Sequence, residues 1–310
     1  MRIVFMGTPE AAVPTLARCL EDGHDVVAVW TQPDKPAGRG KKLTESPVKT
    51  FAQAHNLPVH QPARIKTDEA KRLFASHAAD VAVVVAYGRI LPSEYLTTPR
   101  RGCVNVHFSL LPLYRGAAPV NWAIANGDSA TGVTTMFIEE ELDSGPILLQ
   151  RSTPIGPAET APELMSRLSN IGADLLSETL LSLDAITPRP QRRRDATFAP
   201  MLHKEDGLIT WSKDAFAIER LVRGLQPWPN AFTGYKSKRL VIWKGSPTTN
   251  DVAEPSGSIV AADGDNLIVK SGGHTALQVL EVQLEGGRRM SARDFLNGSH
   301  IKVGERFGAL

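Results

Sequence analysis

Short runs of apolar residues alternate with amphipathic segments through the first half of the chain. Compact apolar runs predict strands at residues 2–6, 25–30 and 81–86, and the run 81–86 has no polar position, as in a parallel strand covered on both faces. Apolar residues recur at helical spacing between these runs. The expected helices are 8–20, with Thr8 as its cap, 48–55, 67–77, 117–127 and 160–184. Strands that alternate with helices in this way favour an α/β fold with a doubly wound, Rossmann-like parallel sheet.

The pattern changes in the last third of the chain. A helix is expected at 213–225, and short strand-like runs separated by glycine turns follow at 239–244, 257–261, 266–270 and 276–282. This spacing predicts a small β-barrel. Between the two patterns, residues 187–200 are rich in Pro and Arg and show no periodicity, which is typical of a linker. We therefore expect a catalytic domain at 1–186, a linker at 187–206 and a barrel domain at 207–310.

Charge and cysteine content limit the possible functions. The net charge of 310 residues is only +2, so any nucleic-acid binding depends on local patches. Such a patch occurs at residues 32–49, which hold five Lys or Arg against two acids, and we expect no regular element there because of its Pro and Gly residues. Cys19 and Cys103 have no metal-binding spacing, no apolar run is long enough to span a membrane, and no signal peptide precedes the first strand. We expect a cytoplasmic protein without a metal.

A polar pair at the end of a predicted strand is the first candidate for chemistry. In the strand 103–108, side chains alternate between the two faces, so Asn105 and His107 share one face while Val104 and Val106 share the other. Burial explains the valines. A histidine and a neighbouring amide can move a proton and stabilise a developing charge. Taken alone, however, the pair also fits two structural polar residues.

A third residue strengthens the chemical interpretation. Asp143 lies in a turn-like sequence after the strand-like run 132–138, where its carboxylate is free to orient an imidazole. Asn105, His107 and Asp143 can then form a proton-handling group of the kind that activates a nucleophile. The first strand ends in Gly-Thr-Pro-Glu, without the three spaced glycines of a dinucleotide site, so a dehydrogenase is disfavoured.

The segment 102–148 resembles the folate-dependent formyltransferase family. The motifs that carry the resemblance are Asn105-Val-His107, Ser109-Leu-Leu-Pro112, Arg115-Gly-Ala-Ala-Pro-Val120 and Leu142-Asp-Ser-Gly145. The resemblance implies that Asn105, His107 and Asp143 transfer a formyl group from 10-formyltetrahydrofolate, as co-substrate, to an amine. It also implies folate contacts, which are Tyr87, Gly88, Ser109, Leu110, Leu111 and Pro112. Phe108 departs from the pattern, since a small residue often follows the histidine.

Similarity over the whole chain is to the members of that family that act on a charged tRNA. The opening strand, the basic loop 32–48 and the apolar run ending at Gly88 all resemble them. This implies an oligonucleotide-binding-type barrel and a loop that reaches the acceptor end, with tRNA contacts at Lys35, Arg39, Lys41 and Lys42. The expected acceptor is the α-amine of methionine on initiator tRNA, and the expected enzyme is a monomer.

Two alternatives remain open at this point. A formyltransferase acting on another amine, such as glycinamide ribonucleotide or an amino sugar nucleotide, has the same catalytic residues. A noncatalytic RNA-binding protein on a degenerate enzyme fold is disfavoured by the intact Asn105, His107 and Asp143. We interpret Arg192 to Arg194 as part of a solvated linker.

Overall fold

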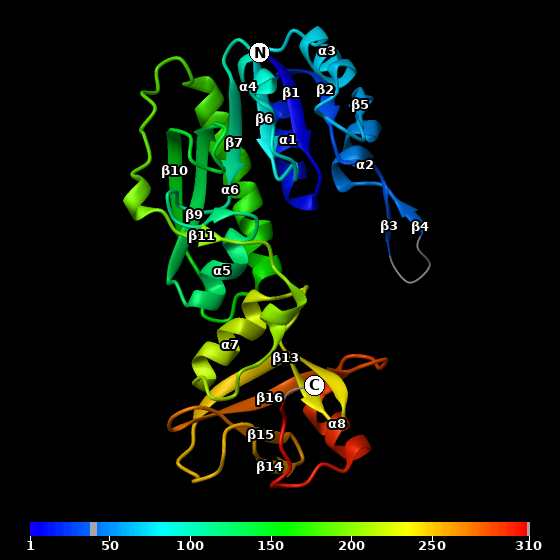
Figure 1. Ribbon diagram of the computed structural model, residues 1–310, viewed down its shortest axis with the longest axis vertical. Helices are drawn as coiled ribbons and strands as arrows, with labels where there is room; N and C mark the ends of the chain where they lie inside the picture. Colours follow the sequence, from blue (N-terminus) through cyan, green and yellow to red (C-terminus); the bar gives the residue numbers. More distant parts are fainter. Residues whose placement is uncertain (38–41, 309–310) are drawn as a thin grey trace. The chain divides into compact units, whose positions relative to one another are not determined.

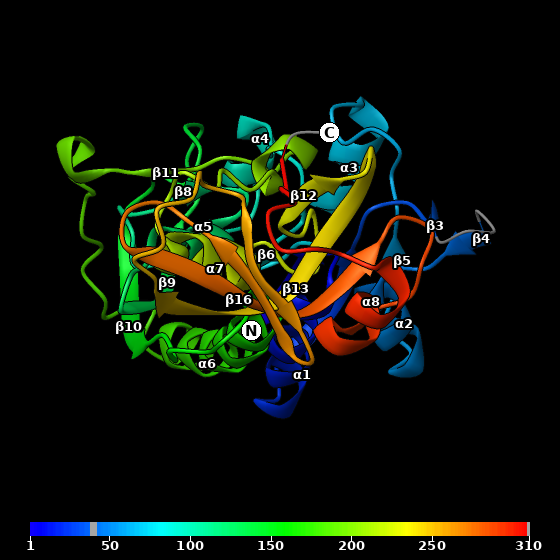
Figure 2. The same ribbon diagram turned by 90° about the horizontal axis from the view of Figure 1, so that it is seen from below.

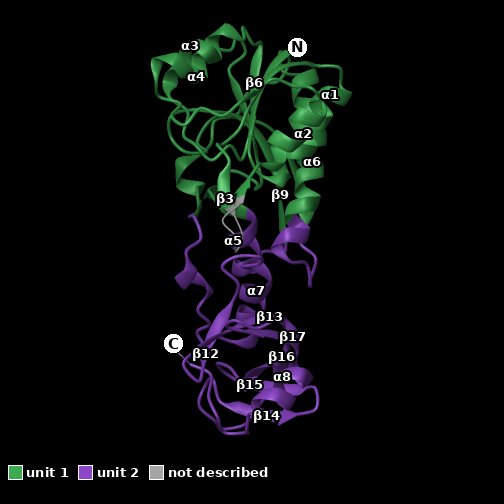
Figure 3. Cartoon of the chain, turned by 90° about the vertical axis from the view of Figure 1, so that its right-hand side faces the viewer, with its two compact units in different colours: residues 1–119, 130–154, 165–199 green, residues 120–129, 155–164, 200–310 purple. Residues whose placement is uncertain are grey.

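The structure is a computed structural model that describes residues 1–37 and 42–308 (Figure 1). The chain divides into two compact units, coloured separately in Figure 3. Unit 1 contains residues 1–119, 130–154 and 165–199, and unit 2 contains residues 120–129, 155–164 and 200–310. The domain limits expected from the sequence, 1–186, 187–206 and 207–310, stay a prediction.

A seven-stranded sheet forms the centre of unit 1, in the order β10-β9-β7-β6-β1-β2-β5. Its strands are β1 (Arg2–Gly7), β2 (Asp25–Trp30), β5 (Val59–His60), β6 (Val81–Val85), β7 (Cys103–His107), β9 (Ala130–Phe137) and β10 (Ile147–Pro154). The five strands from β7 to β5 are parallel, whereas β9 pairs antiparallel with β7 and β10 antiparallel with β9. The predicted Rossmann-like parallel sheet is confirmed, with an antiparallel edge.

The helices of this part of the chain mostly follow the predicted pattern. They are α1 (Val13–Glu21), α2 (Pro47–Ala54), α3 (Asp68–Ser76), α4 (Ser93–Thr97), α5 (Pro119–Asn126) and α6 (Ala161–Leu181). Side chains of Ser46 and Thr67 cap α2 and α3 by accepting from backbone N–H groups. The predicted cap at Thr8 is wrong. A 3-10 turn, Glu10–Ala12, precedes α1, and the Thr8 hydroxyl instead donates to the backbone oxygen of Tyr87 at 3.2 Å.

The two faces of β7 have different surroundings. On one face, α6 packs so closely that a Cβ added to Gly172 would lie 2.9 Å from Cγ1 of Val106 and 3.5 Å from Cε1 of Phe108. The ring of Phe108 is therefore buried under α6, and the missing side chain at Gly172 leaves room for it. On the other face, Cys103 belongs to the apolar core that also contains Trp30.

The segment 187–199, which the sequence predicts to be part of a linker, packs within unit 1. Arg189 forms a backbone bridge with Ile147 of β10, and β11 (Phe198–Ala199) pairs in parallel with β8 (Arg115–Gly116). The side chain of Thr197 accepts a hydrogen bond from the backbone N–H of Tyr114 at 2.8 Å. These contacts bind the segment to the loop that follows β7.

The basic loop contains a short hairpin, so the expectation of no regular element there was wrong. Strand β3 (Lys35–Ala37) pairs antiparallel with β4 (Lys42–Thr44), and Figure 1 shows both strands extending away from α2. A proline is tolerated because each strand of an isolated pair has a free edge. Residues 38–41 lie outside the described part of the chain.

Unit 2 is built on an antiparallel sheet in the order β12-β13-β16-β15-β14, with β17 also paired to β16. Figure 2 shows the two long strands β13 and β16 side by side. The edge strands are linked through residues near the C-terminus, since Gly234 bridges Gly308 and Ser258 bridges Arg306. This closes the predicted barrel. The elements are α7 (Ala215–Gly224), β12 (Phe232–Tyr235), β13 (Lys238–Thr249), β14 (Ile259–Asp263), β15 (Asn266–Lys270), β16 (Thr275–Leu284), β17 (Met290–Ser291) and α8 (Ala292–Ser299).

Candidate active site

His107 is the last residue of β7, and its side chain is buried. Nε2 lies 3.0 Å from the backbone oxygen of Tyr114. Because a carbonyl oxygen only accepts, Nε2 carries the proton and donates it to this bond. Nδ1 lies 3.7 Å from Oδ2 of Asp143. The ring orientation is thus fixed by the backbone, and the nitrogen that can gain or lose a proton faces a carboxylate.

Asp143 reaches this position from the turn between β9 and β10. Its backbone is left-handed, with a φ of +49°, which is uncommon for a residue other than glycine. Its Oδ2 accepts a hydrogen bond from the backbone N–H of Gly116 at 2.8 Å. At Gly145, an added Cβ would lie 1.9 Å from the backbone oxygen of Phe137, so only glycine fits at this end of the turn. The sequence prediction that Asp143 lies in a turn near His107 is confirmed.

Asn105 lies two residues before His107 on β7, opposite Val84 of β6 and Met136 of β9. The side chain is half-buried. Within residues 1–37 and 42–308, its amide has no hydrogen-bond partner. A half-buried amide without a partner is available to a bound molecule. The structure thus places Asn105 and His107 on the same face of the strand and brings Asp143 to His107.

The turn 109–112 is fixed by bonds to its own backbone and to β9. The hydroxyl of buried Ser109 donates to the backbone oxygen of Leu113 at 2.6 Å. The hydroxyl of Thr134 donates to the backbone oxygen of Ser109 at 2.7 Å. Leu111 is buried, whereas Leu110 and Pro112 are half-buried. The serine hydroxyl and Leu111 are therefore used to build the turn, and Leu110 and Pro112 retain accessible surface.

Tyr87 and Gly88 follow β6, next to the end of β7. The ring of Tyr87 lies in the apolar core, where burial raises the pKa of its hydroxyl to about 12. The backbone oxygen of Tyr87 accepts from the side chains of Thr8 and Gln32 at 3.2 and 3.1 Å. Ile90, two residues beyond Gly88, is 71% exposed. This segment thus offers backbone and an apolar side chain at the carboxyl edge of the sheet.

The sequence analysis gave no role to two residues that support the Asp143 turn. Nε2 of Gln191 donates to the backbone oxygens of Asp143 and Gly145 at 2.9 and 2.8 Å. Its Oε1 accepts from Nε and Nη2 of Arg115 at 3.1 and 2.8 Å, and the side chain of Arg115 is only 3% exposed. Gln191 lies in the predicted linker, where periodicity gives no signal, and Arg115 is 76 positions away along the chain.

Two of the four expected tRNA-contact residues lie on the paired strands β3 and β4. Lys35 is exposed on β3, and Lys42 is on β4. Arg39 and Lys41 lie outside the described residues. Lys49, which the sequence analysis counted among the loop cations, is neutralised: its Nζ lies 2.6 Å from Asp34 and 2.9 Å from Glu45.

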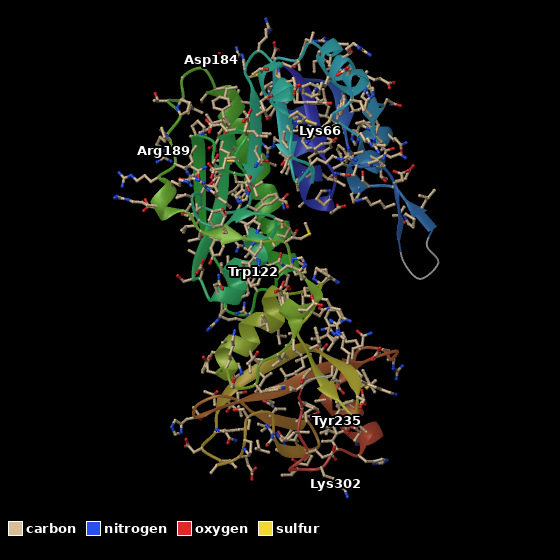
Figure 4. All side chains as sticks on the ribbon, viewed as in Figure 1. Lys66, Trp122, Asp184, Arg189, Tyr235 and Lys302 are labelled. Carbon is tan, nitrogen blue, oxygen red and sulfur yellow. The ribbon has the colours of Figure 1, made fainter. Side chains whose placement is uncertain are left out.

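A cavity of about 370 Å³ lies beside the turn 109–112 and is lined also by residues of β10 and of the segment 189–195. Figure 4 labels Arg189 on that segment, and Nη2 of Arg189 donates to Oε1 of Gln150. Neither His107 nor Asp143 lines this cavity. Across the described residues, no group of three or more His, Cys, Asp or Glu side chains has a metal-binding arrangement. No helix found in residues 1–37 or 42–308 has the length and apolar character needed to cross a membrane.

Comparison with known proteins connects both units to one family. Residues 1–180 match the family model described as formyl transferase, and residues 201–300 match the model described as formyl transferase, C-terminal domain. Methionyl-tRNA formyltransferase of Caldanaerobacter subterraneus subsp. tengcongensis is 49% identical over 307 residues, or 98% of this chain and 99% of the relative. The protein of the same name from Alkaliphilus oremlandii is 44% identical, over 99% of this chain and 100% of the relative.

Among solved structures, an N-formyltransferase from Helicobacter canadensis, in complex with folinic acid and dTDP-3-aminofucose, matches with a TM-score of 0.67. The match covers 89% of this chain and 98% of that protein, at 18% sequence identity. At this identity the likeness concerns the fold alone.

Proposed function

The chain belongs to the formyl transferase family, and we propose that it transfers a formyl group from 10-formyltetrahydrofolate to the α-amino group of methionine on charged initiator tRNA. The observation that carries this proposal is identity of 44–49% over almost the whole chain, both matched domains included, to relatives named methionyl-tRNA formyltransferase. The sugar-modifying relative shares the fold at only 18% identity.

The folate co-substrate fits the segments at the carboxyl edge of the sheet. The unpartnered amide of Asn105 offers a polar contact, and the exposed side chains of Ile90 and Leu142 offer apolar surface for a flat ring. Tyr87 and Gly88 would contribute backbone, while Leu110 and Pro112 would contribute accessible side-chain surface, and Ser109 and Leu111 would support that turn. The co-substrate supplies a formyl carbon that an amine can attack. As the new C–N bond forms, the bond from that carbon to N10 breaks, and tetrahydrofolate leaves with the proton that the amine loses on its N10.

The chemistry assigned to His107 is removal of a proton from the attacking amine. An α-amine is a nucleophile only when neutral, and its pKa of about 8 leaves much of it charged at pH 7. Nε2 of His107 is already committed as a donor to Tyr114, so Nδ1 is the site that accepts a proton. Asp143, 3.7 Å from Nδ1, would stabilise the resulting positive charge.

Asn105 would stabilise the negative charge that develops on the formyl oxygen during attack. Its amide N–H₂ is a donor, and it lies on the same face of β7 as His107. A preorganised donor of this kind contributes about 3 kcal/mol to lowering a barrier. The three side chains would thus have separate roles: His107 accepts the proton, Asp143 stabilises the charge on its ring, and Asn105 donates to the formyl oxygen.

Recognition of the tRNA is assigned to the basic loop and to the barrel of unit 2. Lys35, Arg39, Lys41 and Lys42 would contact the acceptor end, where phosphate contacts fix position and base contacts discriminate. We further propose that the enzyme acts in the cytoplasm as a monomer and needs no metal ion.

The experiment that tests this function offers 10-formyltetrahydrofolate with charged initiator tRNA, charged elongator tRNA and small amines in parallel. We expect rapid formylation of the charged initiator tRNA alone. Faster formylation of glycinamide ribonucleotide or of an amino sugar nucleotide would overturn the assignment of the acceptor, and no transfer to any amine would overturn the assignment of the reaction.

A further inference from the structure

A single amide side chain connects the catalytic turn to a buried cation. Nε2 of Gln191 donates to the backbone oxygens of Asp143 and Gly145, at 2.9 and 2.8 Å, and it also lies 3.8 Å from Sδ of Met136. Its Oε1 accepts two bonds from the guanidinium of Arg115. The amide therefore has five polar contacts, and two of them are to the turn that carries the catalytic carboxylate.

That turn needs external support because its backbone is unfavourable on its own. A left-handed conformation is unfavourable at a residue other than glycine, and it persists only where neighbouring groups hold it. At Asp143, the neighbouring groups are the N–H of Gly116 on the carboxylate and the amide of Gln191 on the backbone oxygen. Without the second group, the turn can relax and move the carboxylate relative to Nδ1 of His107.

Arg115 fixes the position of the amide. Its side chain is 3% exposed, and the nearest carboxylate, Oε1 of Glu141, is 3.9 Å from Nη1, beyond hydrogen-bonding distance. Oε1 of Gln191 is therefore the main acceptor for this buried charge, and a buried charge without an acceptor is costly. Gly116, which directly follows Arg115, donates to the carboxylate of Asp143. The segment 115–116 therefore supports Asp143 twice, directly through Gly116 and indirectly through the bond of Arg115 to Gln191.

We propose that Gln191, held by Arg115, is a positioning residue that keeps the Asp143 carboxylate opposite His107. The inference rests on the proposed function, since it needs Asp143 to act in catalysis. Gln191 touches no reacting atom and acts through Asp143. It follows that its removal lowers kcat while leaving the affinity for charged tRNA and for the folate co-substrate nearly unchanged.

The test is a double-mutant cycle with full-length protein. Gln191→Met keeps the size of the side chain and removes its hydrogen bonds to the turn and to Arg115, and we expect kcat to fall about 10- to 100-fold, the cost of a small misplacement of a catalytic group. In an Asp143→Ala background, measured by single-turnover formylation, the same substitution should change the rate less than about twofold, because residues that act through one another are not additive. An equal loss in both backgrounds, or no loss in the first, would overturn the proposal.

Two further variants separate positioning from stability. Gln191→Glu keeps an acceptor for Arg115 but has no hydrogen to donate to the turn, so its Tm should lie closer to wild type than that of Gln191→Met while kcat stays as low. Thr179→Val removes buried bonds to Thr135 and Leu175 elsewhere in unit 1, and it should lower Tm without lowering kcat. A kcat that follows Tm across all variants would mean a structural role only.

The single Asp143→Ala variant is measured first, since it tests the catalytic role of Asp143 separately from the positioning role of Gln191. Full turnover in that variant would refute the catalytic role of Asp143, and this inference with it. Impaired Asp143→Ala together with unimpaired Gln191→Met would refute only the positioning role.

Discussion

The turn that carries Asp143 and the loop that carries Arg39 belong to the same unit but are held by different kinds of contact. Groups from distant segments hold the turn: the N–H of Gly116 and the amide of Gln191 lie 27 and 48 positions from Asp143. Charged pairs hold the base of the loop instead: Lys49 pairs with Asp34 and Glu45, and Nε2 of Gln61, 27 positions from Asp34, donates to the same carboxylate.

The difference matches two kinds of task. Proton transfer depends on tenths of an ångström, and contacts from several directions fix the geometry of the Asp143 turn. The phosphate binding that we propose for the loop depends on charge, which the lysines and the arginine of residues 35–42 supply. Damage to the turn should therefore lower the rate of the chemical step, whereas damage to the loop should lower the recognition of tRNA.

The largest expected effect is on the catalytic group. His107→Ala should lower kcat about 10²- to 10⁴-fold, the usual contribution of a positioned acid or base. Asn105→Ala and Asp143→Ala should also be severely impaired, and in all three variants the affinity for charged tRNA should be close to wild type. Single-turnover formylation and equilibrium tRNA binding measure the two quantities. Near-normal turnover in all three purified variants would contradict the assignment of the site.

The next effect separates the loop from the site. Arg39→Ala should lower kcat/KM for charged initiator tRNA about 10- to 100-fold, as the loss of a specific contact does. It should leave folate affinity and any slow hydrolysis of the formyl donor almost unchanged, because the Asn105–His107–Asp143 group is intact. Both activities are measured on one preparation. Equal losses of tRNA formylation and of formyl-donor hydrolysis would mean that Arg39 supports the folate site. The separate roles assigned to the Asp143 turn and to the basic loop would then be wrong.

The same comparison shows how far the sequence alone leads. The polar pair Asn105 and His107 was predictable because strand alternation is a local rule, and Asp143 because it lies in a short recognisable motif. Gln191 was not predictable, since its bonds join a segment without periodicity to a turn far away in the chain. Lys49 was counted among the cations of the loop because charge is visible in a sequence, whereas its pairing with Asp34 and Glu45 is not.

The third effect concerns the charge of the loop. Lys41→Ala and Lys42→Ala should each weaken binding of charged tRNA several-fold and reduce the slope of log K against log salt by about one per lost phosphate contact. The matched control is Lys49→Met, which removes a cation already neutralised by two acids and should leave the slope unchanged. Binding titrations at four or more salt concentrations give the slopes. A slope that falls as much in the control would mean that Lys49 contacts phosphate.

The smallest expected effect is on the base of the loop and depends on pH. Hydrogen bonds, first from Gln61 and then from Lys49, lower the pKa of Asp34, and bonds to Asp34 and Glu45 raise the pKa of Lys49. A lowered carboxyl pKa contributes stability above the unfolded value of 3.8 that is lost as pH falls through the folded value. A raised lysine pKa contributes stability below 10.5 that is lost as pH rises through the folded value.

The pair is therefore intact across neutral pH, and Asp34→Asn, which keeps the shape and removes the charge, should expose its contribution. We expect the variant to have a slightly lower Tm than wild type, by a nearly constant amount between about pH 5 and about pH 9. The gap should close as pH falls below 3.8, where wild type loses the same charge, and it should shrink in high salt because both side chains are partly exposed. Thermal unfolding of both proteins across this pH range measures the gap. A gap that widens toward acid would mean that the carboxylate is held by something other than its charge, and the local ion pair would not be what anchors the loop.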